Sequence, residues 1–180
     1  MSVIFVLIPL LAALLIFCGV KARLTALIAS GLTLFLGLGT VFCFDAPIWS
    51  MSLQVLSIPN IHLALGFYDG MSVIMLLLSV IVLFAAILHG GAPEGREKLW
   101  YASSLLIGAG AIGAFLSTDL FFFYAFHELA LIPTFLMIGM LGKGERKEAA
   151  WKITIYLAFG SIILLVGLLM LVNASGSGTW

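Results

Sequence analysis

Charge is what this sequence has least of. Only 9% of its 180 residues are charged, eight Lys and Arg residues balance eight Asp and Glu residues, and 63% of the residues are hydrophobic. Soluble domains carry about 25% charged residues, so a soluble globular fold is excluded and a polytopic membrane protein is indicated. Basic residues cluster only within residues 143–152, so nucleic acid is not an expected partner.

Cysteine is also scarce. Cys18 and Cys43 form no CxxC pair and have no paired histidines beside them. This pattern excludes a cysteine-bound cluster or zinc site in the chain, and we expect both residues to be small packing residues. Positive charge is missing before the first apolar run, since Lys21 and Arg23 follow it instead. We therefore expect that run to be a retained helix and not a cleaved signal peptide.

Long apolar runs are what the sequence has in abundance. Six of them reach membrane-spanning length and predict six transmembrane helices at residues 3–20, 24–44, 71–89, 99–117, 120–141 and 151–172. The longest connection alternates apolar and polar residues on both sides of Pro59-Asn60. This alternation predicts a short β-hairpin on the outer face, between the second and third helices. The expected fold class is all-α with this hairpin, as one transmembrane portion over residues 1–180.

The positive residues are distributed on one side of this arrangement. All eight lie in or beside the connections that follow the first, third and fifth segments, namely Lys21, Arg23, Arg96, Lys98, Lys143, Arg146, Lys147 and Lys152. Positive residues favour the cytoplasmic or matrix side of a membrane. We therefore expect both termini and the hairpin to lie on the non-cytoplasmic side.

A glycine-rich stretch in the fourth segment imitates a nucleotide-binding motif. Residues 108–113 read GAGAIG, which matches the dinucleotide fingerprint letter for letter. No strand precedes the motif and it lies in the middle of an apolar run, so nicotinamide binding is excluded. Small residues in this segment instead predict close approach of a neighbouring helix, with the glycine-rich face near Glu128.

Glu128 is the main functional candidate because it lies inside the fifth apolar segment. It stands eight residues after Leu120, about 12 Å below that end of a helix, where an ionised carboxylate facing lipid costs roughly 3 kcal/mol or more. We therefore expect it to face protein or a hydrated cavity. Tyr124 lies one turn earlier, within reach of a hydrogen bond, and Pro133 leaves the carbonyl of Leu129 without its helical donor. These features predict a proton-handling element; the alternative is a protonated Glu128 that only joins helices by hydrogen bonding.

Two other titratable residues are secondary candidates for proton transfer. His127 precedes the acid but points about 100° away from it in a helix, so we favour a packed histidine over a proton-transfer group. Lys152 stands at the rim of the sixth segment. There we favour a lysine that anchors the helix by reaching to the interface over a proton-transfer group.

Three stretches together resemble one family. Residues 66–72 (GFYDGMS) resemble the G-x-x-D-G-[LIM]-S signature of a third helix, and residues 149–161 (AAWKITIYLAFGS) are similar to the sixth-helix pattern A-A-x-K-F-x-x-Y-x-x-x-G-S. Residues 118–134 (TDLFFFYAFHELALIPT) resemble the fifth-helix pattern T-D-L-F-x-F-Y-x-F-x-E-x-x-L-[IV]-P. These patterns are typical of antiporter-like subunits. The proline five residues after Glu128 favours the family of subunit M of NADH-quinone oxidoreductase, which is mitochondrial subunit 4.

The resemblance implies a membrane-arm subunit of respiratory complex I that couples NADH oxidation and quinone reduction to proton pumping. In the family the acid matching Glu128 pairs with a lysine on the seventh helix, Lys152 matches the sixth-helix lysine, and His127 replaces a usual tryptophan. The chain would work as part of an enzyme without a redox centre or cofactor of its own, since flavin, iron–sulfur clusters, NADH and quinone belong to partner subunits. The expected location is the bacterial inner membrane, with the mitochondrial inner membrane as the alternative.

The chain resembles only the N-terminal portion of the family. Helices seven and eight, which complete the first half-channel of the family, have no counterpart in these 180 residues. A complete proton path from these residues alone is therefore not expected. Three alternatives stay open: a subunit of a multisubunit Na⁺/H⁺ antiporter, a subunit of a membrane-bound hydrogenase, and a truncated membrane scaffold that transports nothing.

Overall fold

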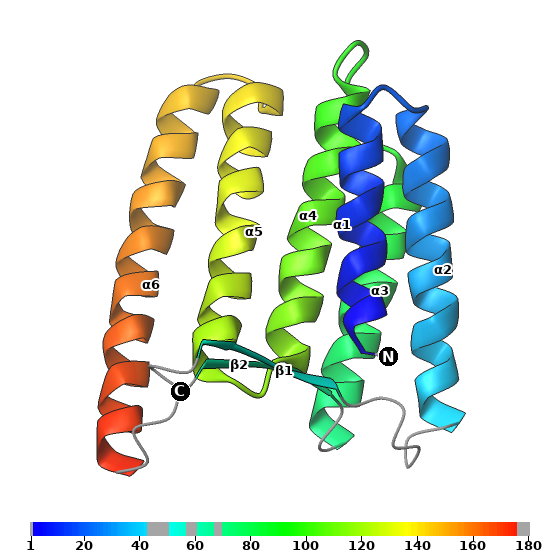
Figure 1. Ribbon diagram of the computed structural model, residues 1–180. Helices are drawn as coiled ribbons and strands as arrows, with labels where there is room; N and C mark the ends of the chain where they lie inside the picture. The colour runs from blue at the N-terminus through cyan, green and yellow to red at the C-terminus, as the bar shows by residue number, and fades with distance from the viewer. Residues whose placement is uncertain (1, 43–50, 57–60, 67–69, 176–180) are drawn as a thin grey trace.

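The computed structural model describes residues 2–42, 51–56, 61–66 and 70–175. These residues form six helices that stand side by side, with a small two-stranded sheet across one end (Figure 1). The helices are α1 (Val3–Phe17), α2 (Ala22–Phe42), α3 (Gly70–His89), α4 (Glu97–Leu116), α5 (Leu120–Leu141) and α6 (Arg146–Ser175). The motif at residues 66–72 falls partly outside the described residues.

Five of the six helices are long and apolar enough to cross a membrane, which corrects the expected number of six. The exception is α1, with 15 residues. A helix of that length is about 22 Å long, whereas the hydrocarbon core is about 30 Å thick. The predicted segment continued to residue 20, but Gly19 has a φ of +103°. That conformation suits glycine and ends the helix early.

The sixth helix begins earlier than the apolar pattern predicts. It starts at Arg146, five residues before the predicted segment, and includes a charged turn. Glu148 and Lys152 form an ion pair in that turn, with Oε1 and Nζ 2.6 Å apart. Such a pair at positions i and i+4 supports helix that lies outside the apolar region. Hydropathy detects only the apolar part of a helix, which explains the difference.

Helix α4 is the centre of the bundle and packs against α1, α2, α3 and α5. Its sequence is rich in Gly, Ala and Ser, and most of its residues are buried. The largest fully buried side chains of the bundle come mainly from α1 to α4, among them Phe5, Ile16, Leu76, Ile87 and Tyr101. By contrast α6 packs chiefly against α5, and few residues of either helix are buried.

The predicted close approach at the glycine-rich stretch is confirmed. A Cβ atom on Gly113 would lie 2.5 Å from the ring of Phe126, and one on Gly110 would lie 2.8 Å from the Phe126 carbonyl oxygen. On the other side of α4, a Cβ on Gly108 would lie 2.6 Å from Leu83 of α3. These glycines therefore let α3 and α5 approach the α4 backbone, as small residues do between membrane helices.

Two strands, β1 (Met51–Leu56) and β2 (Ile61–Leu65), pair antiparallel with Met51 opposite Leu65. The Ser2 hydroxyl donates to the Leu65 carbonyl at 2.6 Å, and the Gly66 amide donates to the Leu116 carbonyl at 3.0 Å. The first bond attaches the sheet to the start of α1, and the second attaches it to the end of α4. Figure 1 shows it at the N-terminal end of α1, opposite the α1–α2, α3–α4 and α5–α6 connections. Which side of a membrane this end faces stays a prediction.

One expectation about cysteine is wrong. Cys18 is exposed at the C-terminal end of α1 and is not a packing residue. In the last turn of the helix, which precedes Cys18, only Ile16 is buried among residues 14–17. Cys43 lies outside the described residues.

Candidate functional site

The helix that carries the candidate acid begins at a well-defined cap. The carboxylate of Asp119, which is only 4% exposed, accepts hydrogen bonds from the amides of Phe121 at 2.9 Å and Phe122 at 3.2 Å. These amides have no partner within the helix, so the carboxylate satisfies them and opposes the positive end of the helix dipole. The cap fixes where α5 starts and thereby the depth of the residues that follow.

Glu128 faces α6, where it contacts Ser161. The Ser161 hydroxyl donates to Oε1 of Glu128. The same hydroxyl lies 3.0 Å from the phenol oxygen of Tyr124, which stands one turn before Glu128 on α5. Ser161 is only 3% exposed. The three side chains thus form a cluster between α5 and α6, in which Tyr124 and Glu128 are joined through one buried hydroxyl.

A serine hydroxyl has one proton to donate and can also accept. When Ser161 donates to the carboxylate, the phenol of Tyr124 is the donor to Ser161. When the carboxyl group is protonated, the order reverses: Glu128 donates to Ser161 and Ser161 donates to Tyr124. The cluster therefore satisfies Glu128 in both protonation states, which is what a group that binds and releases protons needs.

A cavity of about 240 Å³ adjoins the acid on the α6 side. Its lining combines the Glu128 carboxyl group and Thr154 with the apolar residues Leu131, Ile132, Phe135, Leu157 and Ala158. A water molecule takes up about 30 Å³ of liquid volume, so several water molecules fit. The cavity extends from Glu128 along α6 toward the turn that carries Thr154, which is the direction of Lys152.

The structure does not connect His127 to this cluster. Its Nδ1 atom is buried and has no hydrogen-bond partner among the described residues. The side chain is half-buried. It precedes Glu128 by one residue and therefore lies about 100° away from it around the helix. A role for His127 in proton transfer therefore gains no support from its contacts, and its function stays a prediction.

Lys152 is also distant from the acid. It pairs with Glu148 on the outside of α6, where the side chains are 65% and 57% exposed. Nine residues separate it from Ser161, about 13 Å along the helix. The structure thus joins Glu128 and Tyr124 through Ser161, where a direct hydrogen bond between them was expected, and leaves Lys152 and His127 apart from them.

Ser161 is the residue of the site that was not singled out from the sequence. A signal for it is present, because a serine in the middle of the long apolar run of α6 has to find an acceptor away from lipid. Serine and threonine hydroxyls in a helix often donate to the backbone carbonyl four residues earlier, as Thr154 does to the Ala150 carbonyl at 2.8 Å. Only the packing of α6 on α5 shows that Ser161 bonds to a neighbouring helix instead. Among the described residues, no group of three or more His, Cys, Asp or Glu side chains could hold a metal ion.

Comparison with known proteins identifies the relatives of this chain. Residues 117–179 match the family model described as NADH:quinone oxidoreductase/Mrp antiporter, TM. NADH-quinone oxidoreductase subunit M of Rhodobacter capsulatus is 35% identical over 120 residues, which are 67% of this chain and 23% of that protein. The chloroplastic NAD(P)H-quinone oxidoreductase chain 4 of Mesostigma viride is 35% identical over 172 residues, which are 89% of this chain and 34% of that protein.

Solved structures give the same result for the fold. A chain of respiratory complex I from Thermus thermophilus matches 99% of this chain with a TM-score of 0.85 and 26% identity. A chain of the Mrp complex from Dietzia sp. matches 99% with a TM-score of 0.74 and 26% identity. This chain spans 37% and 35% of those chains, and about a quarter to a third of the two sequence relatives. The family and the apolar helices together identify an integral membrane protein.

Proposed function

Because this chain is a relative of the antiporter-like membrane subunits of NADH:quinone oxidoreductase, we propose that it serves in a proton-translocating subunit of the membrane arm of complex I. The subunit would couple NADH oxidation and quinone reduction to proton pumping. The observation that carries the proposal is the contact of Glu128 with the Ser161 hydroxyl, inside the matched residues 117–179.

The proposed partners follow from the same relationship. The chain would assemble with the other membrane-arm subunits, while flavin, iron–sulfur clusters, NADH and quinone would be bound by partner subunits. The proposed location is the bacterial inner membrane. Both termini would lie on the non-cytoplasmic side, because all eight Lys and Arg residues lie in or near the α1–α2, α3–α4 and α5–α6 connections, at the other end of the bundle.

In the proposed mechanism, Glu128 is the residue that takes up and releases the proton. Water in the cavity beside Thr154 would deliver the proton to the carboxylate, since the lining of the cavity runs from Glu128 to Thr154, which lies nearer the end of the bundle that carries the positive residues. Ser161 would keep the acid hydrogen-bonded before and after protonation by reversing its donor direction. Tyr124 would complete the chain as donor or acceptor. The three groups hold a proton at one depth, so transfer across the membrane requires further groups.

A second function from the same superfamily is a subunit of a Na⁺/H⁺ antiporter. It is favoured by the family model, which covers both groups of proteins, and by the fold shared with a chain of the Mrp complex. The acid cluster would then exchange protons against sodium ions without a quinone. Proton uptake that depends on quinone favours the first function, and uptake that depends on a sodium gradient favours the second.

The experiment that tests the proposal replaces Glu128 with Gln in the full-length subunit, assembled with its partners in membrane vesicles. Glutamine keeps the shape and a hydrogen bond to Ser161 but cannot exchange a proton. We expect quinone-dependent proton uptake to be lost or strongly reduced. Glu94→Gln is the matched control, because Glu94 is exposed in the connection before α4 and the change in charge is the same.

The scaffold alternative predicts a different result. If this portion of the protein only packs in a membrane assembly, Glu128→Gln leaves proton uptake at the level of Glu94→Gln. That outcome would reject the proposed role of Glu128. Assembly of both variants is checked by the amount of complex recovered from the membrane.

A further inference from the structure

Two guanidinium groups meet at the end of α5 that lies on the side of the positive connections. Arg96, which precedes α4, donates from Nη1 to the carbonyl oxygen of Met140. Arg146, the first residue of α6, donates to the same oxygen at 3.2 Å. Two donors to one oxygen lie within about 6 Å of each other. The carbonyl at a helix C-terminus supplies only a partial negative charge, so the two cations are not neutralised by it.

A hollow of about 490 Å³ adjoins this pair of arginines. It is lined by Gly95, Arg96, Glu97, Lys98, Leu99 and Met140. Its lining carries two positive side chains, Arg96 and Lys98, and one carboxylate, that of Glu97. Arg146 shares the Met140 carbonyl with Arg96 and adds a third positive charge beside the hollow, which leaves two positive charges in excess. The excess charge, at the rim of the helices where a bilayer has its headgroups, fits an anionic group such as a phosphate.

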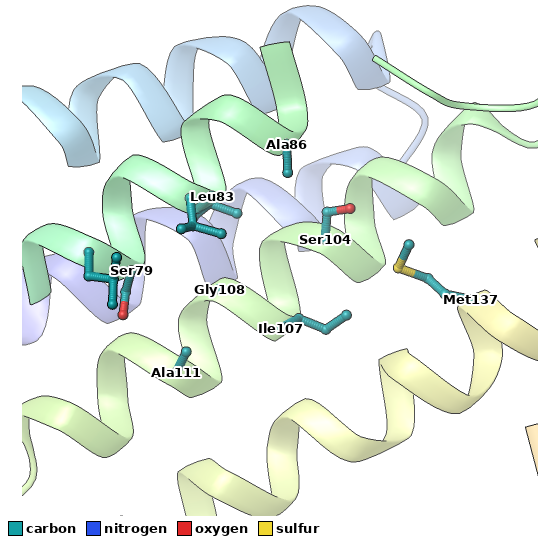
Figure 2. A pocket seen from close by; sticks show the side chains of 10 residues that line it. Ser79, Leu83, Ala86, Ser104, Ile107, Gly108, Ala111 and Met137 are labelled. Atoms are coloured by element: carbon teal, nitrogen blue, oxygen red, sulfur yellow. The ribbon is translucent and has the colours of Figure 1, made fainter. Parts of the chain in front are cut away.

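An apolar groove of about 340 Å³ lies next along the same helices, between α3, α4 and α5 (Figure 2). Its two serines are already occupied: Ser79 donates to the Met75 carbonyl at 2.8 Å and Ser104 to the Trp100 carbonyl at 2.8 Å. The remaining lining is apolar, with Leu83, Ile107 and Ala111 among its residues. The groove therefore offers a surface for a hydrocarbon chain and no free polar partner.

The hollow and the groove follow one another along the contact of α4 with α5. Met140 lines the hollow and Met137, one turn earlier, lines the groove. Figure 2 shows Met137 extending from α5 toward the turn of α4 that carries Ser104. Residues three apart share a helix face. One molecule with an anionic head and an apolar tail therefore fits both sites at once.

We propose that the hollow and the groove together bind an anionic glycerophospholipid, with its phosphate at Arg96 and Arg146 and one acyl chain in the groove between α3, α4 and α5. A free phosphate ion would leave the groove unused, and an uncharged lipid would leave the two guanidinium groups uncompensated. The charge and the apolar lining together thus select an anionic lipid. This site is separate from the Glu128 cluster, which lies on the face of α5 toward α6.

The test uses phosphatidylglycerol with a photoactivatable acyl chain, in vesicles that contain the full-length subunit assembled with its partners. After irradiation, labelled peptides are mapped by mass spectrometry. We expect labelling at residues 78–86 and 104–111. The double variant Arg96→Gln with Arg146→Gln should lower this labelling by about 30-fold at limiting probe, because each arginine that contacts the anionic headgroup contributes about fivefold in affinity.

The matched control is Lys143→Gln with Lys147→Gln, which removes two positive charges from the same end of the bundle. Neither lysine donates to the Met140 carbonyl in the described structure. Labelling in this control should stay within about twofold of the unchanged protein. Equal losses in the two double variants would mean that only the general surface charge attracts the lipid, and the proposal would be rejected.

Two further comparisons identify the occupant. Phosphatidylcholine carrying the same photoactivatable chain should label residues 104–111 several-fold less, and equal labelling would overturn the requirement for an anionic head. Glycerol phosphate, which has no acyl chain, should not displace the probe; displacement at equal concentration would make the occupant a phosphate group alone. Ala111→Phe fills the groove and should abolish labelling. Labelling that persists in the assembled variant would show that the groove does not hold the acyl chain, and the proposal would be rejected.

Discussion

The close contact of α4 with α5 gives a prediction whose size can be worked out from the structure. A Cβ atom on Gly113 would lie 2.5 Å from the Phe126 ring, whereas ordinary contacts between carbon atoms are about 3.5–4.0 Å. Gly113→Ala therefore forces the ring or the whole of α5 to move by about 1 Å. Overpacking of this kind costs roughly 1–3 kcal/mol.

The matched control is Gly167→Ala on α6, where a Cβ would have no atom within 4 Å. Alanine gains up to about 1 kcal/mol over glycine in a helix interior, and this gain is common to both variants. The difference between them therefore isolates the steric cost. At roughly 2–4 °C per kcal/mol for a chain of this size, Gly113→Ala should melt about 2–12 °C below Gly167→Ala.

Thermal unfolding of the two variants in the same detergent measures this difference. A second readout is proton uptake in vesicles, because Phe126 lies two residues before Glu128 and a displaced α5 would loosen the contact with Ser161. Equal melting temperatures for the two alanine variants would refute the close approach at Gly113. Reduced stability with full proton uptake would refute the inference that this contact positions the acid.

Three further predictions concern the same helices. Ser161→Ala removes the hydroxyl between Tyr124 and Glu128 and should lower quinone-dependent proton uptake at least about tenfold, since a hydrogen bond to a charged group contributes about 1.5–3 kcal/mol; Ser161→Thr keeps the hydroxyl and should retain most of the uptake. Asp119→Ala removes the cap of α5 and should lower the free energy of unfolding by about 1 kcal/mol, measured by thermal unfolding, whereas Asp119→Asn should lose less. Lys152→Gln breaks an exposed ion pair and should change the free energy of unfolding by less than about 1 kcal/mol. We expect unchanged proton uptake in that variant, as for an anchoring lysine, and a loss of uptake would instead assign Lys152 to the proton route.

The positions of the helices could be predicted because a segment that crosses a membrane has to be long and apolar, and such runs are easily found in the sequence. Each long apolar run has to satisfy its backbone internally, which only a helix does for a single segment. The ends were predicted less well, for two different reasons. At Gly19 a positive φ ends α1 before the apolar run ends, and at Arg146 a charged turn extends α6 beyond it. In both places local backbone chemistry decides the boundary and hydropathy does not.

The site could be predicted in part. The spacing of Tyr124 and Glu128 on one helix follows from the helical repeat, and the depth of the acid follows from its distance to the start of α5. The partner on α6 could not be deduced in this way, because sequence spacing within one helix carries no information about which residue of another helix lies opposite. Ser161 is 33 residues from Glu128, and only the packing of α5 on α6 brings them together.

The two sides of α5 differ in how firmly they are held, and this difference bears on the proposed function. Toward α4, the helix is fixed by the contacts of Phe126 and Ala130 with two glycines and by a buried cap at Asp119. Toward α6, it is joined through a polar cluster beside a cavity. A hydroxyl group can change from donor to acceptor without any movement of a helix, whereas the packed contacts toward α4 cannot change unless α5 is displaced. The acid can therefore alter its hydrogen bonding while its depth in the membrane stays the same.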